Sequence, residues 1–171
     1  MTKIRPANLG DAALLLDIYR PFVTDTAVSF ELQPPSVEEF EERIAKALGQ
    51  WAWLVAENER GPVGYAYATS YRSRGAYRWS VETSAYVRAD HRGQGLGRRL
   101  YQELLPILVE KGYCNAYAGI ALPNDASVGL HRSLGFTAIG VFRRAGWKFG
   151  AWHDVSWWQL GLRPKPPDGH E

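Results

Sequence analysis

The feature of this sequence that most limits its fold is a glycine-rich turn between an apolar strand and a helix. Residues Arg92-Gly93-Gln94-Gly95-Leu96-Gly97 follow an alternating run that ends at Val87, and a helical pattern continues over 95–110. Glycine lets backbone N–H groups approach a phosphate closely, and a helix N-terminus adds free donors and the positive end of a dipole. The turn therefore predicts a pyrophosphate cradle; the alternative is a glycine-rich turn that holds no ligand.

Two other kinds of phosphate cradle do not fit the turn. A P-loop places a Lys followed by Ser or Thr after its last glycine, whereas Arg98 and Arg99 follow here. A dinucleotide fingerprint needs G-x-G-x-x-G in the first strand–helix–strand unit, whereas this G-x-G-x-G spacing lies past the middle of the chain.

The order of the elements predicts a mixed sheet. Strands are expected over 2–5, 52–57, 63–71, 77–87, 116–122, 137–144 and 152–162. Helices are expected after Asn8 or Asp11, after Ser36, over 95–110, and from Asn124 or Asp125 to Leu134. Consecutive strands before the cradle favour antiparallel pairing, and the strand–helix alternation after it favours parallel crossovers. We expect an α/β (mixed α+β) fold, with a central sheet of about seven strands and helices on both faces.

Composition limits the class of protein. The 171 residues, 46% of them hydrophobic, suit one domain, expected over 1–163, followed by a flexible Pro-rich tail over 164–171. A single cysteine, Cys114, excludes a disulfide within the chain, and one Cys with four scattered His suggests no metal site. A net charge of +2 does not by itself imply nucleic acid. Without an apolar signal region or a membrane-length apolar run, a cytoplasmic protein without membrane association is expected.

Two motifs resemble the GNAT superfamily of N-acetyltransferases. The cradle matches that superfamily's acetyl-CoA motif, R-x-x-G-x-G, between a strand and a helix. The stretch 124–136 is similar to its N-x-x-[AS]-x-x-L-Y-x-x-x-G-F motif, with His131 where a Tyr is common. The resemblance implies the GNAT fold and acetyl-CoA as co-substrate.

A closer resemblance covers nearly the whole chain. The stretches 77–87, 122–125 and 146–155 are similar to phosphinothricin and methionine sulfoximine acetyltransferases. That family acetylates the α-amino group of small amino-acid analogues and is typically homodimeric. The resemblance therefore implies a small amino-acid acceptor, direct attack on acetyl-CoA in a ternary complex, and a homodimer.

The resemblance also implies which residues hold acetyl-CoA. Ala85, Tyr86 and Val87 end the strand that pairs with the pantetheine arm in the family, and a bulge there would free an N–H for the thioester carbonyl. Gly93 to Arg98 would hold the pyrophosphate, and Arg92 or Arg99 could reach the ribose phosphate. Asn124 would contact the pantetheine amide, and it also suits a helix N-cap.

Three residues are candidates for acid–base chemistry. Glu82 is the candidate general base, since an ammonium group must lose a proton before it attacks a thioester. Strand alternation puts Glu82 on the face opposite Val87 unless a bulge intervenes, and the alternative is an exposed charged residue. His131 could protonate the CoA thiolate, although that thiolate can leave unaided. His153 is an alternative base; its neighbour Asp154 points to the other face of the strand.

The acceptor site is expected around the loop before the Glu82 strand. Arg side chains or loop N–H groups there could bind a carboxylate and a phosphinate or sulfoximine group. Candidate substrate-binding residues are Phe30, Arg72, Arg74, Gly75, Ala76, Tyr77, Leu134 and Trp147. Core packing is the alternative for Phe30, Leu134 and Trp147. Other functions remain open: acetylation of a protein N-terminus or a polyamine, and a non-catalytic acyl-CoA-binding module.

Overall fold

The structure of the chain is a computed structural model that describes residues 1–167. The strands are β1 (Lys3–Pro6), β2 (Ala52–Asn58), β3 (Gly61–Ser70), β4 (Ser80–Val87), β5 (Asn115–Ala121), β6 (Thr137–Lys148) and β7 (Ala151–Gly161). The helices are α1 (Ala12–Thr24), α2 (Val37–Gln50), α3 (Leu96–Glu110) and α4 (Asp125–Ser133). The strands form one seven-stranded sheet in the order β1-β2-β3-β4-β5-β7-β6.

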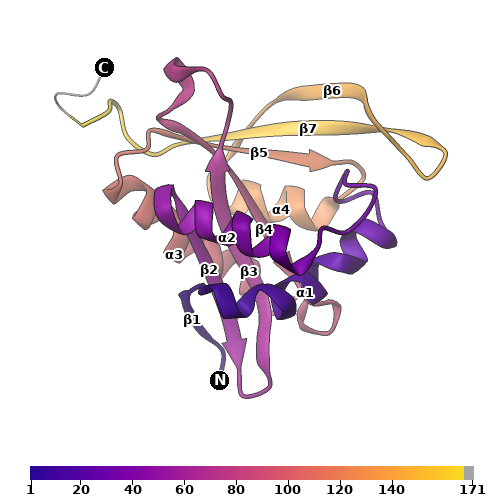
Figure 1. Cartoon of the computed structure of the whole chain (residues 1–171). Helices are drawn as coiled ribbons and strands as arrows, with labels where there is room; N and C mark the ends of the chain where they lie inside the picture. The colour runs from indigo at the N-terminus through magenta and orange to yellow at the C-terminus, as the bar shows by residue number, and fades with distance from the viewer. Residues whose placement is uncertain (168–171) are drawn as a thin grey trace.

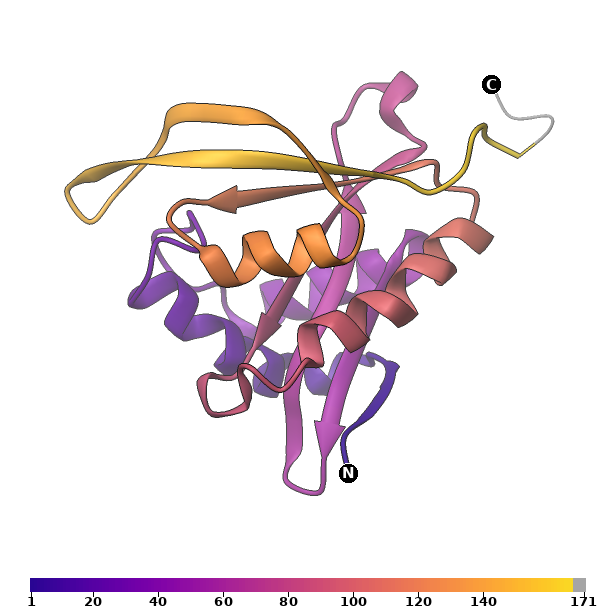
Figure 2. The same ribbon diagram turned by 180° about the vertical axis from the view of Figure 1, so that it is seen from behind.

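Two helices cover each face of this sheet. Helices α1 and α2 lie on the face seen in Figure 1, and α3 and α4 lie on the face seen in Figure 2. All pairings are antiparallel except the parallel pair β4–β5. The expected mixed seven-stranded sheet with helices on both faces is therefore confirmed.

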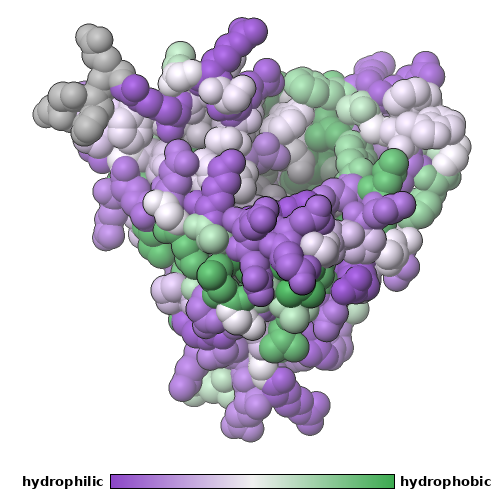
Figure 3. Space-filling view, in the orientation of Figure 1, coloured by the Kyte–Doolittle hydropathy of each residue, from purple (hydrophilic) through white to green (hydrophobic). Residues whose placement is uncertain are grey.

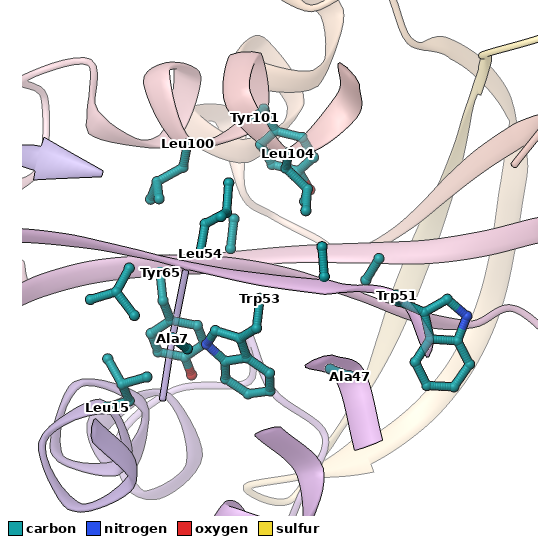
Figure 4. Packing of buried hydrophobic residues seen from close by; sticks show 14 of the residues in the cluster. Ala7, Leu15, Ala47, Trp51, Trp53, Leu54, Tyr65, Leu100, Tyr101 and Leu104 are labelled. Carbon is teal, nitrogen blue, oxygen red and sulfur yellow. The ribbon is translucent and has the colours of Figure 1, made fainter. Parts of the chain in front are cut away.

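The core lies on both sides of β2 and β3. Trp53 stacks on Tyr67 with ring centroids 4.2 Å apart and packs edge-on against Phe40 of α2. On the opposite face, Leu54 points toward Leu100 of α3, as Figure 4 shows. Aromatic rings bury large apolar areas, so these two layers hold β2 and β3 in place.

The strands β4 and β5 separate soon after they meet. Their pairing is limited to Ser80–Glu82 with Asn115–Tyr117. Figure 2 shows β4 rising steeply while β5 and the β6–β7 hairpin run across the top. The end of β4 thus has no strand on its β5 side, and a gap opens through the sheet.

Two predicted strand boundaries were wrong. The strand expected from 77 begins at Ser80, because Gly75–Tyr77 form a 3-10 turn in which Tyr77 N–H donates to the Arg74 carbonyl at 2.9 Å. The strand expected to end at 144 continues to Lys148, because a register shift between Phe142 and Gly146 restores its pairing with β7.

The proline-rich segment at the C-terminus is described only in part. Residues 164–167 are described, and Pro167 Cγ lies 2.6 Å from the position that a Cβ on Gly112 would take. The rest of the tail expected over 164–171 lies outside the described residues. Within 1–167, no helix is long and apolar enough to cross a membrane.

Candidate active site

A cleft occupies the gap where β4 leaves β5. Its walls are residues 83–86 of β4, residues 118–121 of β5, and side chains of α3 and α4; Val28, from the connection between α1 and α2, lies at one side. Figure 3 shows the α1–α2 face hollowed at the upper right, with apolar residues on the walls of the hollow.

The end of β4 directs backbone groups that β3 does not use toward its open side, where Ala85 lines the cleft and the Val87 carbonyl accepts from Arg92 Nε. Tyr71 N–H donates to the Ser80 carbonyl and Arg88 N–H donates to the Val63 carbonyl, so even-numbered residues of β4 point their backbone groups at β3. The groups of Ala85 and Val87 therefore point to the open side. The β3–β4 register is regular from Val81 to Val87, so the bulge considered from the sequence is absent from this ladder.

The glycine-rich turn forms the start of α3. Gly93 and Gly95 have φ values of +73° and +75°, a region that favours glycine, and a Cβ on either would meet no atom within 4 Å. Gly95 is the N-cap of α3, and no side chain caps the helix. The first N–H groups of α3 thus face open space, and the turn can accept an anionic group.

The arginines around the turn have different partners. Arg92 donates from Nε to the Val87 carbonyl at 3.3 Å and lies 4.9 Å over the Phe22 ring, on the α1 side of β4. Arg99 donates to the Thr2 carbonyl at 2.9 Å. Arg98 is exposed in the first turn of α3. Of these three side chains, Arg98 is the one without a hydrogen-bond or ion-pair partner among residues 1–167.

Helix α4 forms the other side of the cleft. Asn124 Oδ1 accepts a hydrogen bond from Ser127 N–H at 3.1 Å and so caps the helix, and Asn124 also lines the cleft. A Cβ on Gly97 would lie 3.1 Å from Leu130, so the absence of a side chain at Gly97 lets α3 approach α4 closely.

Glu82 lies on the α1–α2 face of the gap. Alternation puts it on the same face as Tyr86, whose ring packs against Tyr19 and Phe22 of α1. Glu82 is half-buried. Burial raises the pKa of its carboxyl group above the ordinary value, and the nearby positive charge of Arg72 partly opposes this rise.

A buried hydrogen-bond network occupies the opposite face. The Tyr101 hydroxyl lies 3.1 Å from His131 Nε2 and 3.2 Å from Thr83 Oγ1. His131 Nδ1 lies 2.8 Å from the Ser127 carbonyl, so Nδ1 carries the proton and Nε2 is left as an acceptor. Burial lowers the pKa of His131, so the imidazole is neutral at neutral pH.

Sequence reasoning missed Tyr101 as a site residue. It belongs to the buried stripe of α3 with Leu100 and Leu104, and its spacing is that of a core residue. Tyr101 is fully buried among the residues around the cleft, and only the hydrogen bond between its hydroxyl and His131 distinguishes it from a packing residue.

His153 and Asp154 have separate partners. His153 Nε2 lies 2.9 Å from the Lys148 carbonyl and donates to it, and Asp154 accepts from Arg144 N–H at 2.8 Å. His153 also lies near Phe30, with ring centroids 6.2 Å apart. His153 and Asp154 thus form hydrogen bonds with different parts of the β6–β7 hairpin.

The loop before β4 carries Arg72 and Arg74. The Arg72 guanidinium lies 5.0 Å from the Tyr71 ring centroid and 5.7 Å from that of Tyr77. Arg72, Arg74 and Tyr77 line an open hollow of about 390 Å³ that shares no lining residue with the main cleft. Gly75 and Ala76 lie in the 3-10 turn itself.

Three residues expected to form walls of the acceptor pocket lie in different parts of the structure. Phe30 packs on Gly146 of β6, where a Cβ would meet its Cζ atom at 2.6 Å. Trp147 is 56% exposed on the hairpin and packs against Trp152. Leu134 packs against the core at the end of α4. No cluster of three or more metal-ligating side chains occurs within residues 1–167.

This arrangement defines a class of enzyme. A sheet that splits beside a phosphate cradle is the architecture of acyl-CoA-dependent acetyltransferases. The chain matches the family model of the acetyltransferase (GNAT) domain over residues 4–157, and it belongs to this family. It is an acetyl-CoA-dependent N-acetyltransferase, with acetyl-CoA as co-substrate.

Relatives with named activities share most of the chain. It is 41% identical over 166 residues to a phosphinothricin N-acetyltransferase of Streptomyces viridochromogenes, covering 96% of this chain and 91% of the relative. It is 37% identical to an L-methionine sulfoximine/L-methionine sulfone acetyltransferase of Pseudomonas paraeruginosa, covering 94% and 95%. A crystal structure of a phosphinothricin acetyltransferase from Sinorhizobium meliloti in complex with AcCoA superposes with a TM-score of 0.93 at 35% identity, covering 98% of this chain and 94% of that one.

Proposed function

We propose that this enzyme acetylates the α-amino group of a small amino-acid analogue of the phosphinothricin, methionine sulfoximine or methionine sulfone type. The observation that carries the proposal is the gap between β4 and β5, which joins the Glu82 face of the sheet to the Tyr101 face. The acceptor reaches the gap from the Glu82 side and acetyl-CoA fills it lengthwise. The names of the relatives support this class of acceptor.

The cradle binds the pyrophosphate of acetyl-CoA. Gly93, Gly95 and the uncapped first turn of α3 offer N–H donors and open space, and Arg98 adds positive charge. The backbone groups of Ala85 and the N–H of Val87 pair with the pantetheine arm, as a strand would, and Asn124 contacts it from α4. The Ala85 N–H stabilises charge that develops on the thioester oxygen.

Glu82 takes the proton from the acceptor amine, directly or through a water molecule. Loss of this first proton turns the ammonium into the attacking amine. The C–N bond then forms as the C–S bond breaks, CoA leaves as a thiolate, and the second nitrogen proton goes to the thiolate or to solvent. Because burial raises the pKa of Glu82, the carboxylate is a stronger base than an exposed one.

The Tyr101 hydroxyl supports the departing sulfur from the other face. His131 is neutral and its N–H is already bonded to the Ser127 carbonyl, so it suits accepting from the Tyr101 hydroxyl better than donating a proton itself. The Tyr101 O–H, which donates within the His131–Thr83 network in the free enzyme, turns to the sulfur as the thiolate forms.

Replacing Tyr101 by Phe should lower kcat by roughly 10- to 100-fold, since a hydrogen bond to a charged group contributes about 1.5–3 kcal/mol. The KM for acetyl-CoA should change little. Tyr113→Phe is the matched control, because it removes a hydroxyl that donates to the Gln50 carbonyl away from the cleft. Equal kcat values for the two variants would remove Tyr101 from the mechanism. Steady-state kinetics measures both.

The arginine loop recognises the anionic groups of the acceptor. Arg72 is the arginine whose charge acts on Glu82, so a carboxylate bound by it would lie close to the base. The rings of Tyr71 and Tyr77 orient its guanidinium. Such binding would fix the α-amino group relative to the thioester.

A turnover screen tests the proposed function. Free CoA is followed with DTNB over amino acids, methionine sulfone, methionine sulfoximine, phosphinothricin, a polyamine and a peptide with a free N-terminus. We expect turnover of the amino-acid analogues and a strong loss when the carboxylate is a methyl ester. Equal turnover of ester and acid, or preference for the polyamine or peptide, would contradict the proposal. CoA binding without any turnover would indicate a non-catalytic module.

The β6–β7 hairpin provides a surface for a homodimer. Strand β6 is an open edge of the sheet, and Phe142, Trp147 and Trp152 on the hairpin are each about half exposed. An exposed apolar edge favours pairing with another chain, and a second copy presents the same edge. Analytical ultracentrifugation should show twice the monomer mass; a monomer at micromolar concentration would contradict this assembly.

A further inference from the structure

One buried charge lies outside the catalytic groups described above. Lys148, the last residue of β6, is 5% exposed. Its ammonium donates to the carbonyls of Val23 and Ser29, each at 2.7 Å. Desolvation lowers the pKa of Lys148, and the negative charge of Glu31 opposes that shift. A buried ammonium is costly unless it is paired, so these contacts hold it strongly in one place.

Both carbonyls belong to the chain that leads from α1 to α2. Val23 lies in the last turn of α1, where carbonyls lack partners within the helix. Ser29 lies in the 25–36 connection. A positive charge is favourable at a helix C-terminus, so Lys148 caps α1 from a strand more than a hundred residues away in the sequence.

The same connection is anchored on its inner side. The Tyr19 hydroxyl bonds to Ser29 Oγ at 2.6 Å and also to the Glu31 carboxylate. Arg43 of α2 donates from Nη1 to Glu31 at 3.0 Å. Ser29 and Glu31 thus point into the body of the protein, which directs the residues between and before them outward.

The outward residues reach the active site and the hairpin. Val28 lines the cleft beside β4 and β5. Phe30 lies flat on Gly146, two residues before Lys148, and near His153. The Lys148 ammonium and the Phe30–Gly146 contact therefore join the 25–36 connection to the β6–β7 hairpin at adjacent points.

We propose that Lys148 is a positioning residue for the acceptor: by binding the carbonyls of Val23 and Ser29 it holds the 25–36 connection against the β6–β7 hairpin and so fixes Val28 at the cleft. The acceptor part of this inference rests on the proposed function. The pyrophosphate cradle is built from Gly93, Gly95 and the first turn of α3, and residues 25–36 are not among the groups that form it. Val28 does line the cleft beside β4, so loss of the clamp should weaken acceptor binding strongly and acetyl-CoA binding much less.

The test compares Lys148→Met with Lys111→Met, which removes an exposed lysine directly after α3. Lys148→Met should raise the acceptor KM by about tenfold or more, since small misplacements are costly, and the acetyl-CoA KM by much less. Hydrogen exchange in the 25–36 peptides should become faster in the free enzyme. Lys111→Met should alter neither. An unchanged acceptor KM, or unchanged exchange in 25–36, in folded Lys148→Met would overturn the proposal.

A second pair of variants decides the matter if Lys148→Met does not fold. Gly146→Ala forces the Phe30 ring away without touching the charge, whereas Gly140→Ala on the same strand meets no atom within 4 Å. Only Gly146→Ala should raise the acceptor KM and speed exchange in 25–36. Equal behaviour of the two alanine variants would count against the clamp. If the wild type acetylates no amino-acid analogue, the proposed function fails, while hydrogen exchange still tests the clamp.

Discussion

Replacing Gly95 by Glu is expected to abolish measurable acetyl-CoA binding and to leave the chain folded. Gly95 is the N-cap of α3, and its missing side chain leaves open space in front of the first helical N–H groups. A glutamate would project a carboxylate into the space proposed for the pyrophosphate. Lost hydrogen bonds and charge repulsion together should weaken binding by at least about 10²-fold.

The backbone strain of this substitution can be separated from its effect on the ligand. A side chain at positive φ costs about 1 to 3 kcal/mol, which a folded domain of this size can tolerate. Gly61→Glu is the control, because Gly61 also has a positive φ and open space but lies in the β2–β3 turn. Isothermal titration should show lost acetyl-CoA affinity for Gly95→Glu only. Unchanged affinity in a folded Gly95→Glu protein would contradict the cradle.

Replacing Glu82 by Gln is expected to lower kcat by roughly 10²–10⁴-fold, the usual effect of losing a general base. The KM for acetyl-CoA should change little, because Glu82 lies on the face of the gap from which we propose that the acceptor enters. The wild-type rate should rise with pH as Glu82 loses its proton. Since burial raises the pKa of Glu82, this acidic limb should lie above the pKa of an exposed glutamate. The variant should lack it.

Stability gives an independent check on the Glu82 variant. A raised pKa means that the folded state favours the neutral carboxyl more than the unfolded chain does, so ionisation above that pKa costs folding free energy. Gln is neutral, and the Tm at neutral pH should be no lower than that of the wild type. Glu103→Gln, on the exposed side of α3, is the activity control. A Glu82→Gln kcat within a few-fold of the wild-type value would contradict Glu82 as the general base. The base would then be His153, which His153→Gln would test, or solvent.

The fold was predictable wherever local chemistry agrees with tertiary packing. The Ser36–Glu39 pair forms the capping box that opens α2, with Glu39 N–H donating to Ser36 at 3.1 Å. The glycine turn lies at the start of α3 because its positive φ values suit glycine. Where tertiary contacts decide, prediction failed: pairing with β7 carries β6 past Arg144, a non-glycine residue at φ +51°.

The candidate site was less predictable than the fold because its contacts join distant segments. Tyr101 has the spacing of a core residue, and only the fold brings its hydroxyl to His131, thirty residues away. From the sequence, Lys148 is expected to be a charged residue at the end of a strand, and such a side chain normally lies in solvent. Its burial depends on hydrogen bonds to carbonyls of α1 and of the following connection. The sequence around Lys148 does not predict these distant partners. Glu82, by contrast, was predicted through resemblance to a family, and its role stays a prediction.

The most direct test of the account is a crystal structure of the enzyme with an unreactive acetyl-CoA analogue and an amino-acid acceptor. We expect the pyrophosphate at Gly93–Gly95, the pantetheine between β4 and β5, and the acceptor nitrogen between Glu82 and the thioester carbonyl. The separate hollow lined by Arg60, Arg88 and Arg92 should be free of nucleotide. A nucleotide in that hollow, or an acceptor amine on the Tyr101 face away from Glu82, would contradict the account.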